Sequence, residues 1–427
     1  MIPTFFACFL LLQSLTPEVI EHSQAGAVAR EQGRLDVAIQ EFRRVTELQP
    51  NSATGHADLG DAYFQKGEYG AAIPELELAL RLGPNLMATH QTLGVALLVQ
   101  GNPEAALPHL EKMHTPELLG RAYLETGRLG SAITALHAAL EGKPKDPDLL
   151  YYFGRAMALA SKQSFEQLVK VNPDLARKSR AADQLAKVNP DLAPKSSAGA
   201  DDENRPPQDP VNLLKALAEK PNDADLLFAL SRTAALASRQ TFDQILQSNP
   251  NSARAHQVMA ERYVERGRFA EAEREYTESL RLKPYTSNVH HALGDVFAAE
   301  RNWSAAVAQL RMEAQLQPAS ADAFYSLGSV LLQQRQASDA VEELEHANRL
   351  RPDTPQILLA LGRAALAAND AARAETSWIK LLGIDKESAL AASAHFELAA
   401  LYRRSGRTPE ADREKAAYER LRNQGGR

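Results

Sequence analysis

The sequence has almost no cysteine and few aromatic residues. Cys8 is the only cysteine among 427 residues, and Phe, Trp and Tyr together make up 6% of the chain. A disulfide within the chain needs two cysteines, so it is excluded, as are zinc and redox motifs built from paired cysteines. Aromatic residues are few and runs of Val, Ile and Thr are scarce, which favours helices over strands.

Catalytic motifs are also missing. The sequence contains no Gly-x-Ser-x-Gly elbow, no His-Glu-x-x-His zinc motif, no phosphate-binding loop and no dinucleotide glycine fingerprint. Acidic residues such as Asp61 and Asp295 have carboxylates of the kind that act as general bases. No other catalytic residue type forms a motif with them in the sequence. We therefore expect a protein that is not an enzyme and that holds no cofactor and no metal ion.

An excess of positive charge is missing as well. The formal net charge is −6 and the sequence pI is about 6.0. A general binder of the phosphate backbone needs a concentrated basic face. We interpret the basic runs Arg403-Arg404 and Arg420–Arg422 as solvated helix faces, and we expect no nucleic-acid partner.

The first fifteen residues, MIPTFFACFLLLQSL, form an almost wholly apolar run. It is too short to span a bilayer comfortably, and its length is typical of the apolar region of a signal peptide. The basic residues that usually precede the apolar region of a signal peptide are missing, since the first Lys or Arg in the chain is Arg30. We expect residues 1–15 to be an atypical leader that exports the protein to the periplasm, envelope or medium, with no membrane span in the mature chain. The alternative is a cytoplasmic protein in which this run is a buried apolar cap.

A regular period is what the sequence does contain. Pro250, Pro284, Pro318 and Pro352 recur every 34 residues, and small residues keep the same step at Ala260, Gly294, Gly328 and Gly362. A period of this length is the signature of a solenoid, in which each unit buries its apolar face against its neighbours.

Earlier segments carry the same pattern in a fixed order. One unit is marked by His56, Leu59, Gly60, Tyr63, Gly67, Ala72, Leu76, Ala79 and Pro84. These residues resemble the tetratricopeptide repeat family, whose unit is a helix–turn–helix of 34 residues. The resemblance implies an all-α, right-handed α-solenoid of about ten or eleven repeats. We expect it to be bent or divided near residues 176–210, where the repeat pattern decays.

The chain also contains an internal duplication. Residues 144–177 align without gaps on residues 221–254, with half of the positions identical. Both copies lack the turn glycine, and we expect a polar turn and a short second helix in each. Between them, residues 197–210 (SAGADDENRPPQDP) are acidic and rich in Pro and Gly, which is typical of an exposed linker.

These features divide the chain into five segments. After the leader we predict a first repeat array at residues 18–175 and a degenerate repeat with the acidic linker at 176–210. A second array follows at 211–421 and ends in a charged pair of capping helices, because a solenoid needs polar terminal repeats. Residues 422–427 are a tail.

Histidines recur at one repeat position: His22, His56, His90, His256 and His290. Equivalent residues of stacked repeats lie on helices about 8–10 Å apart, whereas zinc ligands need bonds of about 2 Å. We therefore interpret these histidines as packing residues.

The resemblance implies a ligand groove lined by the first helix of each repeat. Carried over by position, the candidate groove combines arginines with aromatic residues, the types enriched in binding hot spots: Arg121, Tyr151, Arg155, Phe228, Arg232, His291, Asp295, Tyr325 and Arg363. The family's Lys/Asn/Arg clamp for a terminal carboxylate is not present at the corresponding positions, which hold Ala57, Asp58, Asp61, Ala88 and Thr92.

Together these observations predict a non-enzymatic scaffold that binds peptides or helical segments of partner proteins in its concave grooves. The alternative is a regulatory or targeting subunit of a separately encoded enzyme of envelope assembly or glycan processing. The sequence leaves the oligomeric state open.

Overall fold

The computed structural model describes residues 16–178, 209–284, 286 and 288–425. Over these residues all regular elements are α-helices and no strand occurs, so the predicted all-α solenoid is confirmed. None of the described helices is long and apolar enough to cross a membrane. The predicted leader, most of the segment 176–210 and the last two residues lie outside the described part of the chain.

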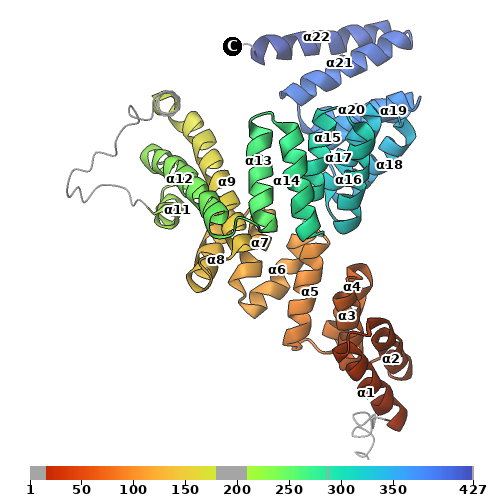
Figure 1. Cartoon of the computed structure of the whole chain (residues 1–427). Helices are drawn as coiled ribbons and strands as arrows, with labels where there is room; N and C mark the ends of the chain where they lie inside the picture. Colours follow the sequence, from red (N-terminus) through yellow and green to blue (C-terminus); the bar gives the residue numbers. More distant parts are fainter. Residues whose placement is uncertain (1–15, 179–208, 285, 287, 426–427) are drawn as a thin grey trace, which may run out of the picture. The chain divides into compact units, whose positions relative to one another are not determined.

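The chain forms two compact units, residues 1–244 and 245–427 (Figure 1). The boundary falls inside a helix, whereas the sequence predicts a division near residues 176–210. The first unit contains α1 (Pro17–Glu31), α2 (Leu35–Leu48), α3 (Ala53–Lys66), α4 (Tyr69–Leu82), α5 (Met87–Val99), α6 (Pro103–Met113), α7 (Pro116–Glu125), α8 (Leu129–Gly142), α9 (Pro147–Val171), α11 (Pro210–Glu219) and most of α12 (Ala224–Ser248).

The second unit is a regular series of helix pairs. It contains α13 (Ala253–Glu265), α14 (Phe269–Leu282), α15 (Val289–Ala299), α16 (Trp303–Leu316), α17 (Ala321–Gln333), α18 (Ala337–Leu350), α19 (Pro355–Ala367), α20 (Ala371–Ile384), α21 (Ala389–Arg404) and α22 (Thr408–Gly425). We call the first helix of each pair the A helix and the second the B helix.

The pair α3–α4 shows why this sequence folds into helix pairs. Ser52 caps the start of α3 by accepting a hydrogen bond from the backbone N–H of Gly55 at 3.1 Å. Gly67 ends the helix in the left-handed region at φ 83°, which a residue without a side chain adopts at no steric cost. Leu76 of α4 then packs fully buried against Gly60 of α3.

The same close approach recurs in the pairs whose A helix has a glycine at this position. A methyl group added to the A-helix glycine would lie under 3.0 Å from a side chain of the B helix. The glycine and its partner are Gly26–Phe42, Gly60–Leu76, Gly94–Leu110, Gly120–Leu136, Gly294–Leu310, Gly328–Leu344 and Gly362–Trp378.

The duplicated segments differ from the prediction. Each forms one continuous helix of 25 residues, α9 and α12, so the expected polar turn and short second helix are wrong. At the expected turns the chain reads Ala-Ser-Lys-Gln and Ala-Ser-Arg-Gln. Without a glycine to adopt a left-handed conformation, these residues, mostly good helix formers, continue the helix.

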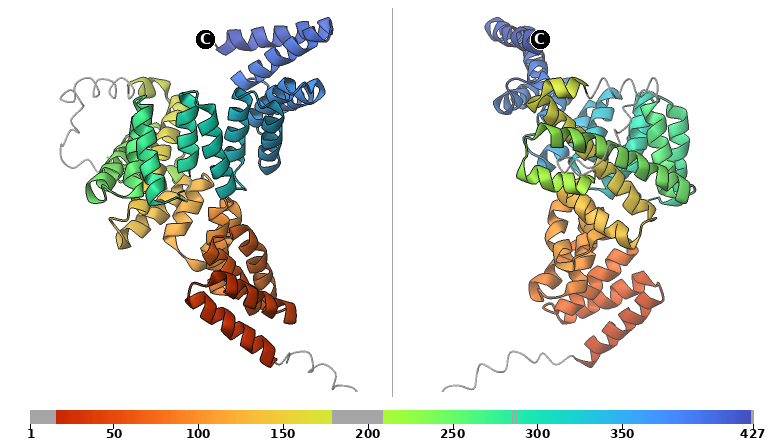
Figure 2. Two further views of the ribbon diagram at one scale, coloured as in Figure 1. Left: turned by 45° about the vertical axis from the view of Figure 1, so that its right-hand side comes forward. Right: turned by 90° about the vertical axis from the view of Figure 1, so that its left-hand side faces the viewer.

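The two duplicated helices pack against each other (Figure 2). The side chain of Gln167 donates a hydrogen bond to the carbonyl of Pro221 at 2.8 Å. In the opposite direction Gln244 donates to the carbonyl of Pro144 at 3.0 Å. These residues are equivalent in the duplication, so the contact is reciprocal, like the contact between two subunits related by a twofold axis. It joins α12 to the first unit.

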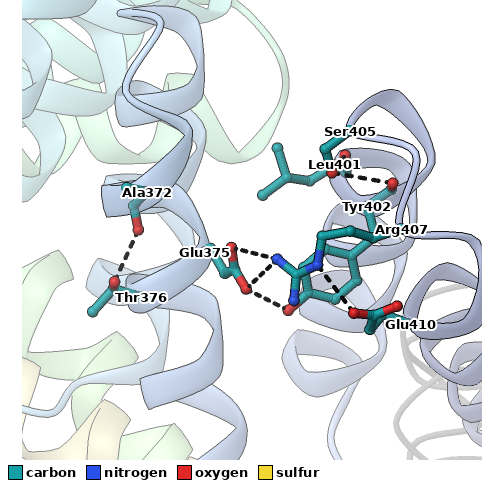
Figure 3. Close-up of polar contacts among 8 residues, drawn as sticks. All are labelled: Ala372, Glu375, Thr376, Leu401, Tyr402, Ser405, Arg407 and Glu410. Carbon is teal, nitrogen blue, oxygen red and sulfur yellow. Dashed lines mark hydrogen bonds and ion pairs between the residues drawn. The ribbon is translucent and has the colours of Figure 1, made fainter.

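A polar cluster links the last two pairs of the second unit (Figure 3). Glu375 of α20 accepts hydrogen bonds from the hydroxyl of Tyr402 and from Arg407, both at 2.9 Å. The Arg407 guanidinium lies 4.1 Å from the centre of the Tyr402 ring and also donates to Glu410. Burial and the bond to Glu375 raise the pKa of Tyr402 to about 12.

Gly362→Ala tests the close approach of the helices. The new methyl would lie 2.2 Å from Nε1 of the fully buried Trp378. We expect urea denaturation to show a free energy of unfolding lower by about 1–3 kcal/mol, the usual cost of overpacking. Gly383→Ala is the matched control in the same pair, because nothing lies within 4 Å of its added methyl. An unchanged midpoint for Gly362→Ala would contradict this account.

Tyr402→Phe tests the polar cluster. A hydrogen bond to a charged group contributes about 1.5–3 kcal/mol, and we expect the variant to lose that much stability at neutral pH. The folded-state pKa lies above the ordinary 10.0, so this contribution is present below pH 10 and is lost as the pH rises toward 12. The difference from wild type should therefore shrink when urea unfolding is measured at about pH 11 instead of about pH 8.

Tyr325→Phe serves as the control for this measurement, because the Tyr325 hydroxyl has no hydrogen-bond partner among the described residues. If the two Tyr-to-Phe variants lost equal stability at both pH values, the role given to Glu375 would be wrong.

Candidate partner-binding surfaces

The second unit places four of the predicted groove residues on consecutive A helices. His291 and Asp295 lie on α15, Tyr325 lies on α17 and Arg363 lies on α19. The side chains of Asp295 and Arg363 are 63% and 47% exposed, so both charges face solvent. Tyr325 is half-buried and packs against the hydrophobic core.

Contacts between neighbouring A helices hold this face in place. Nε2 of His291 lies 3.0 Å from the hydroxyl oxygen of Ser326 on α17. Arg363 donates from Nε to Glu397 of α21 at 2.8 Å. We call the exposed side of α15, α17 and α19 around Asp295, Tyr325 and Arg363 the A-helix face. It displays an aromatic ring between a negative and a positive charge.

The first unit brings the other predicted residues together in pairs. The Arg155 guanidinium lies 5.7 Å from the ring centre of Tyr151, and Arg232 lies 5.7 Å from Phe228. The duplicated helices thus repeat one arginine–aromatic geometry. Each contact is a cation–π interaction of the kind that favours Arg over Lys at such sites.

Tyr151 is nevertheless a core residue. It is 2% exposed, and its ring centre lies 6.1 Å from that of Phe242 on α12. It offers no open surface to a partner in this packing. Phe228 is half-buried against the cluster around Leu168 and Leu227, while Arg232 is exposed.

Arg121 on α7 also has its partners within the chain. Its Nε donates to Glu125 at 2.8 Å, and its guanidinium lies 5.7 Å from the ring centre of Tyr152 on α9. The side chain is only 18% exposed. It therefore connects neighbouring A helices and presents little area to a ligand.

The recurring histidines form contacts inside their own helix pairs. In each case Nδ1 faces a residue 19 positions later on the B helix: Glu41 for His22 at 2.6 Å, Glu75 for His56 at 2.6 Å, His109 for His90 at 2.7 Å, Glu275 for His256 at 2.7 Å and Gln309 for His290 at 2.8 Å. We call this series the histidine ladder. It agrees with the interpretation of these residues as packing residues.

His395 is one more member of the histidine ladder, not included in the prediction from the sequence, and it faces Glu414 with the same separation. The signal was available, because a Glu 19 positions after a His marks three of the other pairs. At His109 the pKa is lowered by burial, by His90 and by Lys112. In the described part of the chain no group of three or more His, Cys, Asp or Glu side chains is arranged to hold a metal ion.

A hollow of about 370 Å³ lies between α21 and α22. We call it the terminal hollow. Phe396 is 54% exposed and its ring centre lies 5.4 Å from that of Tyr418. The remaining lining residues are Ala399, Ala400, Arg403, Arg404, Lys415 and Glu419. Arg403 and Arg404, which the sequence predicts to be solvated, lie in this hollow beside the two aromatic rings, an arrangement that the sequence does not predict.

Several solved structures are similar to parts of the chain, at low identity. MamA from Desulfovibrio magneticus RS-1 is 22% identical, with 40% of this chain and 96% of MamA covered and a TM-score of 0.38. PilF from Pseudomonas aeruginosa is 18% identical, with 46% and 92% covered and a TM-score of 0.38. YrrB, described as a repeat protein with an unusual peptide-binding site, is 19% identical, with 43% and 97% covered and a TM-score of 0.34. No curated protein matches the sequence.

Family models give the stronger result. One tetratricopeptide repeat model matches residues 24–86, 117–167, 258–321, 291–355 and 325–389, and a second matches residues 88–112. Together the matched residues make up more than half of the chain, and most of them lie in the helix pairs described above. The chain therefore belongs to the tetratricopeptide repeat family.

Proposed function

We propose that this protein is a non-enzymatic scaffold that binds a peptide or helical segment of partner proteins on its A-helix face. The observation that carries the proposal is the arrangement of Asp295, Tyr325 and Arg363 on α15, α17 and α19. A half-buried aromatic ring lies between two exposed charges of opposite sign. Aromatic and arginine side chains on a rigid support are the usual anchors of protein interfaces.

The contacts that the polar side chains make within the chain support a binding role over a catalytic one. The histidines that could act as acids or bases face a residue of their own helix pair in the histidine ladder. The cluster of Glu375, Tyr402 and Arg407 joins two pairs. These groups are occupied in holding helices together, which is a structural task.

The charges on the A-helix face define the ligand. A segment crossing from α15 to α19 would place a Lys or Arg near Asp295, an apolar side chain on Tyr325 and an Asp or Glu near Arg363. Complementary charges of this kind set the direction of binding more than its affinity. Arg363 would share its guanidinium between the ligand and Glu397, which already orients it.

The double variant Tyr325→Ala/Arg363→Ala tests this face. We expect it to weaken the capture of specific partners at least about tenfold, because anchor residues contribute 2 kcal/mol or more. Binding is measured by quantitative pull-down against wild type, with thermal unfolding as a check of the fold. The matched control is Met312→Ala/Arg349→Ala on the B helices α16 and α18, where both side chains are exposed.

Partner capture that is unchanged by Tyr325→Ala/Arg363→Ala would disprove the assignment to the A-helix face. The variant Phe228→Ala/Arg232→Ala examines the first unit in the same assay. A loss of binding restricted to this variant would move the proposed site to α12.

We further propose that residues 1–15 direct export. The apolar length of the segment supports this, and the segment lies outside the described residues. Mass spectrometry of the protein isolated from its native cells should find an amino terminus after residue 14 or nearby. A chain from such cells that still begins at Met1 would favour the cytoplasmic alternative.

A further inference from the structure

The terminal hollow lies where one more A helix would dock if the series of pairs continued. In the second unit each A helix packs against the preceding pair, as α19 does against α18 and α21 does against α20 and α19. Phe396 directly follows the ladder residue His395, just as His291 follows His290. His291 contacts Ser326 on the next A helix. Phe396 occupies the equivalent position, yet within the described residues no further A helix packs on it.

The chemistry of the terminal hollow differs from that of the internal junctions. Arg403, Arg404 and Lys415 line it together with one acidic residue, Glu419. Among the described residues neither Arg403 nor Arg404 takes part in an ion pair. Two aromatic rings and an excess of positive charge favour an occupant that is apolar on one face and acidic at its rim.

Helix α1 has the complementary surface. Val28 lies six residues after the ladder residue His22 and is 47% exposed. The equivalent residues Ala62, Ala96 and Val296 are no more than 2% exposed, because each packs on a preceding pair. Leu401, six residues after His395, is also buried at 7% exposed, whereas Arg262, six residues after His256, is half-buried. Val28 is thus the exposed apolar residue at a position that the repeat mostly buries.

The same side of α1 carries acidic charge. Ile20 is 41% exposed, and Glu21, Gln24 and Glu31 are exposed beside it and Val28. Neither of the two glutamates forms an ion pair within the described part of the chain. An apolar strip flanked by carboxylates therefore faces away from α2 and the core.

We propose that α1 of one copy of this protein docks into the terminal hollow of a second copy, where it takes the place of the next A helix. Val28 and Ile20 would cover Phe396 and Tyr418, and Glu21 and Glu31 would lie among Arg403, Arg404 and Lys415. The contact joins two different surfaces, so it leaves a free end on each copy and extends into a chain or closes into a ring. It does not use Tyr325 or Arg363, and it is independent of the proposed scaffold function.

Charge reversal provides the first test. Sedimentation velocity of the full-length protein should show association that grows with concentration and weakens with salt, as the Debye length falls from about 30 Å at 0.01 M to about 3 Å at 1 M. Glu21→Arg/Glu31→Arg and Arg403→Glu/Arg404→Glu should each weaken association at least about tenfold, because like charges then face one another. A mixture of the two variants should associate again, because each supplies the partner charge of the other.

Site-directed crosslinking provides the second test. Gln24 lies two residues after its ladder position, as Ser326 does, so it should face Phe396 of the other copy as Ser326 faces His291. In a Cys8→Ser background we mix Gln24→Cys protein with Phe396→Cys protein under oxidising conditions. A dimer well above the level given by either variant alone is expected, and it can only join two chains.

Three outcomes would overturn the proposal. Wild type could remain monomeric at all concentrations and low salt. Association could persist unchanged in both charge-reversed variants, which would place the contact elsewhere. The mixed cysteine variants could give no more dimer than the single ones. Apart from Phe396 and Cys8, which lies outside the described residues, all substituted side chains are charged or polar and exposed, and circular dichroism checks that each variant is folded.

Discussion

The structure depends on the close approach of two helices at one small residue. A glycine on the A helix lets the B helix come near enough for a large side chain to pack directly on its backbone, as Leu76 does on Gly60. Each pair then buries its apolar face against its neighbours, and stability is shared along the array. The other recurring contacts, including the histidine ladder, add polar partners at the edges of this packing.

The duplicated helices show how strong that constraint is. Gly154 occupies the small position in α9, but α9 runs straight and has no B helix of its own. Phe242 of α12 fills the place, and a methyl group on Gly154 would lie 2.7 Å from its ring. The need to cover Gly154 is met by a helix that follows much later in the chain, and the similarity of the two copies makes the contact reciprocal.

This explains what the sequence could predict and what it could not. The 34-residue period, the small residues and the turn glycines specify local pairing, so the helix pairs follow from them. The duplication is visible in the sequence, but no periodic signal states that one copy packs on the other. Tyr151 was assigned to an open groove on the assumption of a standard repeat. In the structure Phe242 covers its ring, because α9 is paired with α12.

The candidate site follows the same logic. Asp295, Tyr325 and Arg363 lie in the regular part of the array, where transfer by repeat position places them on successive A helices. The terminal hollow was harder to foresee, because its lining combines residues of α21 and α22 that the repeat pattern does not single out. The residues that line it become informative only when they are compared with the equivalent residues at the contacts between internal helix pairs.

Compared with the internal helix pairs, the last pair has polar residues at only some of the positions that are apolar elsewhere. Arg403 stands four positions after Ala399, and Leu366 stands at the same distance after Gly362, the equivalent residue of an internal pair. An Arg at a position where an internal pair has Leu is typical of a helix pair that faces solvent. Phe396, in contrast, is not replaced by a polar residue, although it is 54% exposed. A repeat array needs polar ends to stay soluble, so an aromatic ring kept at such an end, beside unpaired arginines, is better explained by an acidic helix that covers it than by capping alone.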